Sequence, residues 1–277
     1  MQLLRTDARP GSAMRFILAV APFILVAALY LWGAQIRHQR SAAENDGVDK
    51  EKLMPYPTQM VKGFKDSAFE KDVKTQKRLL FMDTWASMRR FIIAYAFVWI
   101  PILLGLHMGT LPYIKAMFRA FLSFFGMVPP LALSAIVILV FGIEELPKIM
   151  LIIIGIFPTL TLSACLAAEE VPNELIQSAK ARGASEFEVV YRVVLPLIWP
   201  KMLDCIRLSF QPAIMCLLAA EFMSATEGLG YRIYLVKRYT AMDVIIPYVL
   251  WMTLLLFTAD YLVRLWIAKR YLWVNKN

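Results

Sequence analysis

The residues of this chain best suited to specific chemistry lie in a polar segment between two hydrophobic runs, and their spacing suits protein recognition rather than bond-making. Pro172 fits the first turn of a helix, because the N–H that proline lacks would have no partner there. Gly183 fits the left-handed residue that commonly follows a helix end. Ser185 and Glu188 have the S-x-x-E spacing of a capping box, which begins a second helix. The segment is therefore predicted to be a compact helix-turn-helix that binds another protein.

Each of these two helices has an apolar stripe. The stripes consist of Leu175, Ile176 and Ala179 in the first helix and of Phe187, Val190, Tyr191 and Val194 in the second. Apolar residues at such intervals are typical of a helix that buries one face. Pro196 is expected to end the second helix, because its ring clashes with the preceding turn.

Other chemistries lack their sequence signatures. The chain contains no G-x-x-x-x-G-K-[ST] loop for nucleotide phosphates, no G-x-S-x-G elbow and no H-E-x-x-H helix. His38 and His107 have no partner at metal-ligand spacing. The three cysteines fall within or at the ends of hydrophobic runs, which argues against a disulfide framework. We therefore expect no catalytic residue, metal or cofactor, and a membrane enzyme is disfavoured because no acidic, basic and nucleophilic residues converge.

Composition indicates a membrane protein. Of the 277 residues 59% are hydrophobic and 18% are charged, which is too apolar for an ordinary soluble domain. A helical span needs about 20 apolar residues. Runs of about this length lie at roughly 16–34, 91–109, 128–142, 146–167, 203–222 and 244–267. The sequence predicts an all-α polytopic protein with about six transmembrane helices in one membrane domain.

The first hydrophobic run has two interpretations. Arg5, Arg9 and Arg15 precede it, as basic residues precede the apolar core of a signal peptide. The run is longer than such a core, however, and it ends in Tyr30-Leu31-Trp32, which is typical of a membrane–water interface. We favour a retained transmembrane helix.

The positions of Lys and Arg predict the orientation. Basic residues cluster before the first run, in the helix-turn-helix segment and in the C-terminal tail, and the positive-inside rule places such clusters in the cytoplasm. The resulting division is a cytoplasmic N-terminus (1–15), a first helix (16–34), an external loop (35–90), a core (91–267) that contains the cytoplasmic segment 168–201, and a cytoplasmic tail (268–277). The formal charge of +9 then reflects topology, and no basic face with interleaved aromatics suggests nucleic-acid binding.

The helix-turn-helix segment carries a recognisable pattern. In permease subunits of ABC importers, the corresponding loop reads E-A-A, three residues, Gly, nine residues, Ile, one residue, Leu-Pro. The matching positions here are Gln177, Ser178, Ala179, Gly183, Val193, Leu195 and Pro196. Gln177 and Ser178 depart from the usual Glu and Ala, and Val193 replaces Ile conservatively. The segment resembles the ATPase-coupling loop of that family.

Further stretches resemble permeases of the nitrate, sulfonate and taurine group, over roughly residues 53–267. They are Leu53-Met54-Pro55-Tyr56-Pro57, Val128-Pro129-Pro130-Leu131-Ala132, Phe141-Gly142-Ile143 with Lys148, and Ala220-Glu221 followed by Glu227-Gly228-Leu229-Gly230. Glu145 is a departure, since the group has glycine at or near this position, and the turn around it is the part of the comparison most open to difference.

The resemblance implies partners and a location. It implies a multi-pass protein of the bacterial plasma (inner) membrane that forms a homodimer among lipids, binds a separate ABC ATPase through the loop 172–196, and receives a small, mostly anionic solute from an external binding protein. No nucleic acid is expected as a partner. The alternative is a non-transporting assembly or anchor protein that uses the same loop to dock a cytoplasmic partner.

Polar residues within the hydrophobic runs are costly in hydrocarbon and usually face a bundle interior or a water-filled path. Gln211 is a candidate for lining such a path or for bonding a neighbouring helix. Glu221 is a candidate gate, or a structural partner of Arg232 or Lys237, and we favour the structural role. Asp260 and Arg264 are four residues apart, which predicts a local pair on one helix.

The predicted topology can be tested by labelling. Single cysteines introduced near Asp66 and near Lys180, in a cysteine-free background, should react with impermeant reagents from opposite sides of sealed cells, because an odd number of spans separates the two positions. Labelling of both positions from one side would overturn the six-span arrangement.

Overall fold

The computed structural model describes residues 12–43, 55–69 and 78–271, and every regular element in these ranges is helical. The helices are α1 (Ser12–Ala43), α2 (Pro57–Phe69), α3 (Leu79–Ala96), α4 (Trp99–Thr110), α5 (Pro112–Phe125), α6 (Pro130–Phe141), α7 (Glu145–Glu169), α8 (Asn173–Ala181), α9 (Glu186–Glu188), the π-helix η3 (Val189–Val194), α10 (Leu195–Leu208), α11 (Phe210–Ser224), α12 (Leu229–Lys237) and α13 (Met242–Arg270).

The described residues contain five helical stretches long and apolar enough to cross a membrane. They are Ile17–Ile36, Leu79–Thr110, Glu145–Glu169, Glu186–Ser224 and Met242–Arg270. A sixth crossing exists if α5 and α6, which meet at a bend of 101°, together form one span. The expected all-α polytopic fold is confirmed, and the third expected run (128–142) corresponds to α6, the second helix of this bent pair.

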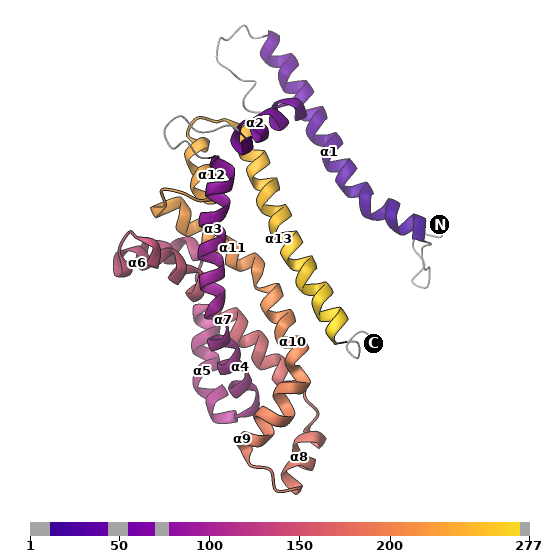
Figure 1. Ribbon diagram of the computed structural model, residues 1–277, viewed down its shortest axis with the longest axis vertical. Helices are drawn as coiled ribbons and strands as arrows, with labels where there is room; N and C mark the ends of the chain where they lie inside the picture. The colour runs from indigo at the N-terminus through magenta and orange to yellow at the C-terminus, as the bar shows by residue number, and fades with distance from the viewer. Residues whose placement is uncertain (1–11, 44–54, 70–77, 272–277) are drawn as a thin grey trace.

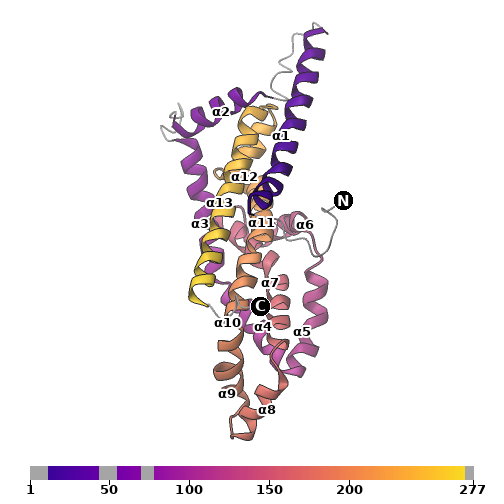
Figure 2. The same cartoon turned by 90° about the vertical axis from the view of Figure 1, so that its right-hand side faces the viewer.

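The helices form an elongated bundle around α7 (Figures 1 and 2). α3, α4, α10 and α11 lie along α7, whereas α1 stands to one side. The short helices α8 and α9 project at one end of the bundle, and α2 and α12 lie toward the opposite end. The C-terminal end of α13 points toward the α8 end (Figure 1).

The second span begins earlier than its hydrophobicity suggests. The sequence places the start of this span at 91, whereas α3 begins at Leu79, so residues 79–90 are helix rather than loop. Asp83 and Arg90 are each 0% exposed. These charges interrupt the hydrophobic run, but each is paired inside the bundle, which allows the helix to be buried along this length.

Prolines shape these spans in different ways. α3 and α4 are separated at Phe97–Val98, just before Pro101, because Pro101 cannot donate the hydrogen bond that the Phe97 carbonyl would otherwise accept. Pro158 lies inside α7, which stays continuous from Glu145 to Glu169.

Close contact between α4 and α7 depends on small residues. Gly105 and Gly109 form a G-x-x-x-G pair on α4, the spacing that allows two membrane helices to approach closely. A Cβ added at Gly105 would lie 2.4 Å from the carbonyl oxygen of Thr161 and 2.6 Å from the Cβ of Ala164. At Gly109 it would lie 2.5 Å from the Cβ of Ala168. The two backbones are therefore in contact, and no larger residue fits between them.

Gly105→Ala should destabilise the bundle by about 1–3 kcal/mol, because the added methyl group meets backbone that cannot yield without separating the helices. Thermal unfolding of the purified protein in detergent measures the effect. Leu103→Ala, on the same helix but 41% exposed, is the control and should change stability much less. Equal stability of Gly105→Ala and the unmodified chain would show that α4 and α7 are not packed at this point.

Candidate functional site

The first helix of the candidate loop ends as its glycine predicts. Gly183 has φ +85°, the left-handed conformation that is strained for residues with a side chain. Its N–H donates to the Lys180 carbonyl (2.9 Å), and the N–H of Ala184 donates to the Ala179 carbonyl (3.2 Å). These two bonds form a Schellman motif that closes α8. A Cβ at Gly183 would meet nothing within 4 Å, so backbone conformation alone selects glycine here.

The second helix begins with the expected capping box. The Ser185 hydroxyl accepts the Glu188 N–H (3.3 Å), and the Glu188 carboxylate accepts the Ser185 N–H (3.1 Å). The expected stop at Pro196 is wrong, because helix continues from Glu186 through α10 to Leu208. Residues 189–194 are wound as a π-helix, and Leu195 N–H donates to the Val190 carbonyl. This wider turn accommodates the proline that follows.

The second helix buries part of its expected stripe. Val190 and Val194 are 4% and 0% exposed as expected, and Val189 is 3% exposed as well. Phe187, expected on the buried stripe, is 69% exposed. In the first helix Leu175 is 45% exposed, whereas Ile176 packs against the core. The loop is thus anchored through its valines and presents Leu175 and Phe187 outward.

The residues that match the coupling-loop pattern differ in exposure. Those that are exposed are Gln177, Ser178, Gly183 and Pro196, and those that are partly buried are Ala179, Val193 and Leu195. Ala179 packs against the core at the point where α8 and η3 meet. The four residues named first are exposed, as are Leu175 and Phe187.

Polar contacts hold the loop in one shape. Lys180 pairs with Glu186 across the turn (2.5 Å), and Arg192 pairs with Glu188 (2.9 Å). The Tyr191 hydroxyl lies 3.2 Å from His107 Nε2, which ties η3 to α4. These exposed ion pairs contribute little individually, so the buried valines and the Tyr191 contact make the loop a rigid extension of the bundle.

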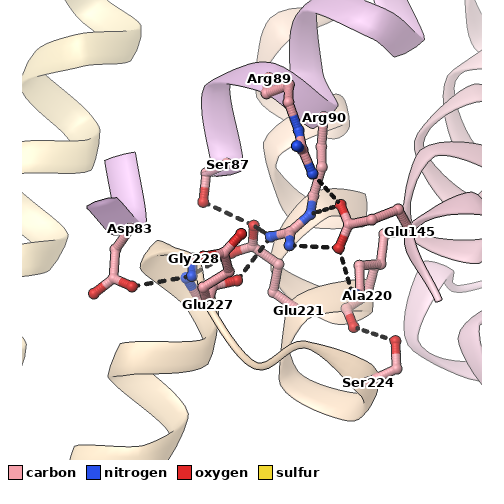
Figure 3. A network of polar contacts seen from close by, with 12 residues as sticks. Asp83, Ser87, Arg89, Arg90, Glu145, Ala220, Glu221, Ser224, Glu227 and Gly228 are labelled. Carbon is pink, nitrogen blue, oxygen red and sulfur yellow. Dashed lines mark hydrogen bonds and ion pairs between the residues drawn. The ribbon is translucent and has the colours of Figure 1, made fainter. Parts of the chain in front are cut away.

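Glu221 belongs to a buried ion-pair network at the other end of the bundle (Figure 3). Its carboxylate, 0% exposed, accepts hydrogen bonds from Arg90 Nη1 (2.7 Å) and the Ser87 hydroxyl (2.7 Å). The expected structural role fits this position, but the partner is Arg90 rather than Arg232 or Lys237. Because Glu221 is fully enclosed, it does not line an open surface in this structure.

The glycine-rich stretch after α11 closes around Glu221. Gly230 N–H donates to the Glu221 carboxylate (2.8 Å), and the Glu227 carbonyl accepts from Arg90 (2.8 Å). Gly228 has φ +132°, and a Cβ there would lie 2.5 Å from a Glu221 oxygen. The A-E…GLG stretch is therefore a unit in which the glycines make room for the carboxylate.

Two further carboxylates extend the network. Asp83 pairs with Arg232 (2.8 Å) and accepts the Gly228 N–H (3.1 Å). The pKa of Arg232, on α12 outside the spanning helices, is raised: burial alone lowers it, but the hydrogen bond and charge of Asp83 outweigh burial. Glu145 binds Arg90 through two hydrogen bonds of 2.8 Å and pairs with Lys148 (2.8 Å). The glutamate that departs from the resembled pattern is thus a principal partner of Arg90.

Sequence reasoning missed this network although a signal was present. Asp83, Ser87 and Arg90 are spaced four and three residues apart, which places them on one face of a helix. The second hydrophobic run begins only after Arg90, so hydrophobicity alone places these three residues in the predicted loop 35–90.

The other polar candidates lie on the α10, α11 and α13 side. Gln211 is exposed beside Arg207 in a groove between these helices. The expected pair of Asp260 with Arg264 is wrong, since Asp260 binds Arg207 (2.7 Å) from the neighbouring helix. Cys165, Cys205 and Cys216 are free thiols. Among the described residues no three His, Cys, Asp or Glu side chains are grouped to hold a metal ion.

Arg90→Met should cost about 3–5 kcal/mol of stability, because it leaves the fully buried Glu221 carboxylate without its charged partner. The adjacent Arg89 also pairs with Glu145 (3.1 Å), but its side chain is 47% exposed, so Arg89→Met should cost about 1 kcal/mol or less. Thermal unfolding in detergent and the amount inserted in membranes measure both variants. Similar losses for the two arginines would contradict the central role of Arg90.

With this geometry established, comparison with known proteins identifies relatives. The chain is 33% identical over 162 residues to the taurine transport system permease protein TauC of Escherichia coli (strain K12), an overlap of 58% of this chain and 59% of TauC. It is 31% identical over 158 residues to a probable ABC transporter permease protein of Brucella melitensis biotype 1, covering 57% of this chain and 64% of that protein. The chain thus spans less than two thirds of the length of either relative.

The fold has a match among solved structures. An inward-facing structure of the MetNI methionine ABC transporter aligns with a TM-score of 0.58 over 67% of this chain and 93% of the matched chain, at 17% sequence identity. The family model for binding-protein-dependent transport system inner membrane components matches residues 98–270, which is more than half of the chain. This chain therefore belongs to that family of multi-pass inner-membrane proteins.

Proposed function

We propose that this chain is the permease subunit of an ATP-driven importer for a small, anionic solute of the nitrate, sulfonate and taurine kind. The observation that carries the proposal is the rigid helical loop from Asn173 to Val194, which projects from one end of a membrane bundle. Family membership and the taurine-transport relative support the importer and the class of solute.

The loop suits a coupling role because of how it is attached. Its second helix runs without interruption from Glu186 into α10, so a force on α9 and η3 acts directly on a membrane-spanning helix. Leu175 and Phe187 provide exposed apolar contacts, and anchors of this kind dominate protein interfaces when they enter a pocket. The proposed partner at this surface is an ABC ATPase subunit, which would supply the hydrolysis for which this chain has no phosphate-binding loop.

The remaining partners follow from the family. An external solute-binding protein would deliver the solute to the end of the bundle that contains α2 and α12. A second copy of this chain would complete the translocation path, with lipid around the outer helices. On this proposal the segment 168–201 is cytoplasmic, 35–90 is external, and Gln211 faces the path.

A non-transporting anchor that docks a cytoplasmic protein would use the same loop. Reconstitution separates the two functions. The complex of this chain with its ATPase in proteoliposomes should hydrolyse ATP faster when the binding protein and its solute are both added, and it should accumulate the solute. An ATPase that binds the chain but responds to neither addition would support the anchor.

Gly183→Leu should abolish solute uptake while leaving the protein inserted. A side chain at φ +85° costs about 1–2 kcal/mol, which is small for the bundle but sufficient to reshape the turn between α8 and α9. Gly183→Asn is the matched control, because asparagine tolerates this conformation better than other residues, and it should keep much of the uptake.

Uptake and co-purification of the ATPase are measured for both variants. Normal uptake and normal assembly of Gly183→Leu would show that this turn is not the coupling element.

A further inference from the structure

A groove on the membrane-spanning part of the bundle contains charges of both signs. It has a volume of about 270 Å³ and lies between α10, α11 and α13. Its polar lining consists of Arg207, Gln211, Thr253 and Asp260, and its apolar lining of Leu208, Phe210, Leu256 and Phe257. This space is large enough for a small solute.

On the proposed topology, in which segment 168–201 is cytoplasmic, these charges lie within the depth of the membrane. Lys201 pairs with Glu170 near the loop end of α10, and both side chains are exposed as expected at an interface. Arg207 follows Lys201 by six positions, about 9 Å along a helix. Asp260 precedes Lys269 by nine positions, about 14 Å. Ionised groups at such depth face a bundle interior or a water-filled cavity, because hydrocarbon does not solvate them. The groove is therefore not a lipid-covered face.

The ion pair in the groove is only partly satisfied. Arg207 uses Nη1 on Asp260 (2.7 Å) and Nε on Asp204 (3.1 Å). Among the described residues no partner exists for Arg207 Nη2, for the second oxygen of Asp260 or for the Gln211 amide. The Arg207 and Asp260 side chains are 19% and 36% exposed. The groove thus presents a free N–H donor of a cation and a free oxygen of an anion next to each other.

This arrangement argues against a simple anion as the occupant. Arg207 is flanked by two carboxylates, so the site already carries one more negative than positive charge, and it repels a simple anion. A molecule with both charges can instead place its anionic group on Arg207 and Gln211 and its ammonium group on Asp260. Each end then finds a complementary charge, and no charge is left unpaired in a low-dielectric site.

We infer that the groove formed by Arg207, Gln211, Thr253 and Asp260 is a transient binding site for a small zwitterion that carries an acidic group and an amine. The inference rests on the proposed import function and narrows its solute from the nitrate, sulfonate and taurine kind to those members that carry an amine as well as an acidic group. Arg207 and Gln211 bind the acidic group, and Asp260 binds the amine. Ser209, the residue between α10 and α11, lies beside the groove.

Protection of an introduced cysteine tests the site directly. Gln211→Cys in the assembled transporter is treated with 2-sulfonatoethyl methanethiosulfonate, which is confined to water. The chain without this substitution gives the background of the native cysteines, and Ser178→Cys on the exposed face of α8 is the control for reagent access. Taurine, ethanesulfonate and ethylamine are the probes, added at equal concentration.

Taurine should slow the labelling of Gln211→Cys by about tenfold, whereas ethanesulfonate and ethylamine should each slow it by less than about twofold. No probe should protect Ser178→Cys. Adding Asp260→Asn should remove the advantage of taurine, and Asp260→Glu, which keeps the carboxylate, should retain it. That pair separates a role in binding from a purely structural one.

Three results would overturn the inference: no reaction at Gln211→Cys, no protection by taurine, or equal protection by ethanesulfonate. The first would mean that lipid or a second copy covers the groove. Uptake and ligand-stimulated ATP hydrolysis are measured on the unmodified complex. Their absence would count against the importer itself, whereas their presence without taurine protection would refute only the zwitterion site.

Discussion

A buried guanidinium must be paired, and the pairing of Arg90 fixes the relative positions of the helices around it. Its carboxylate partners come from α7 and α11, and the Glu227 carbonyl comes from the turn before α12. Separating α11 from α3 would leave Arg90 and Glu221, both fully buried, without each other's charge, at a cost of several kcal/mol. Ser87 and Asp83 on the same face of α3 add bonds to the glycine turn. One end of the bundle is thereby closed around a single helix face.

Apolar packing rather than buried ion pairs stabilises the opposite end of the bundle. The loop from α8 to η3 has no buried ion pair among its described contacts and is instead held by three buried valines. Apolar burial is not directional, so the loop keeps its place while its outer face stays free to bind. The continuous helix from Glu186 to Leu208 then connects this face to the membrane. The bundle is therefore specified by charge pairing at one end and by packing at the other.

The parts of this structure that follow local rules could be predicted from sequence. Gly183, Ser185 and Glu188 form hydrogen bonds with backbone groups only a few residues away, so the local sequence predicts their roles. The continuation of the helix beyond Pro196 could not be predicted, because it depends on the π-helical turn that accommodates the proline. Ion pairs between helices were also beyond reach, since Asp260 could pair with Arg264 on its own helix or with Arg207 on another, and only the packing of α10 against α13 decides. The direct α4–α7 contact at Gly105 likewise depends on which helix lies opposite.

The span formed by α10 and α11 connects the two ends of the bundle, and Ser209 lies between these two helices. α11 contains Glu221 in its last turn, which the network holds, whereas α10 is continuous with the loop. A displacement of the loop must either carry the network with it or be absorbed between the two helices. Moving the network breaks buried ion pairs, whereas a bend at Ser209 disturbs the hydrogen bonds of its hydroxyl with Tyr95 and Ile206 and the packing of Phe210 on Phe91 and Tyr95. Buried charges thus hold the network, while hydrogen bonds and aromatic packing hold the junction of α10 and α11. Arg207 and Gln211 lie on opposite sides of it, and any bend there changes the distance between the two polar groups of the groove.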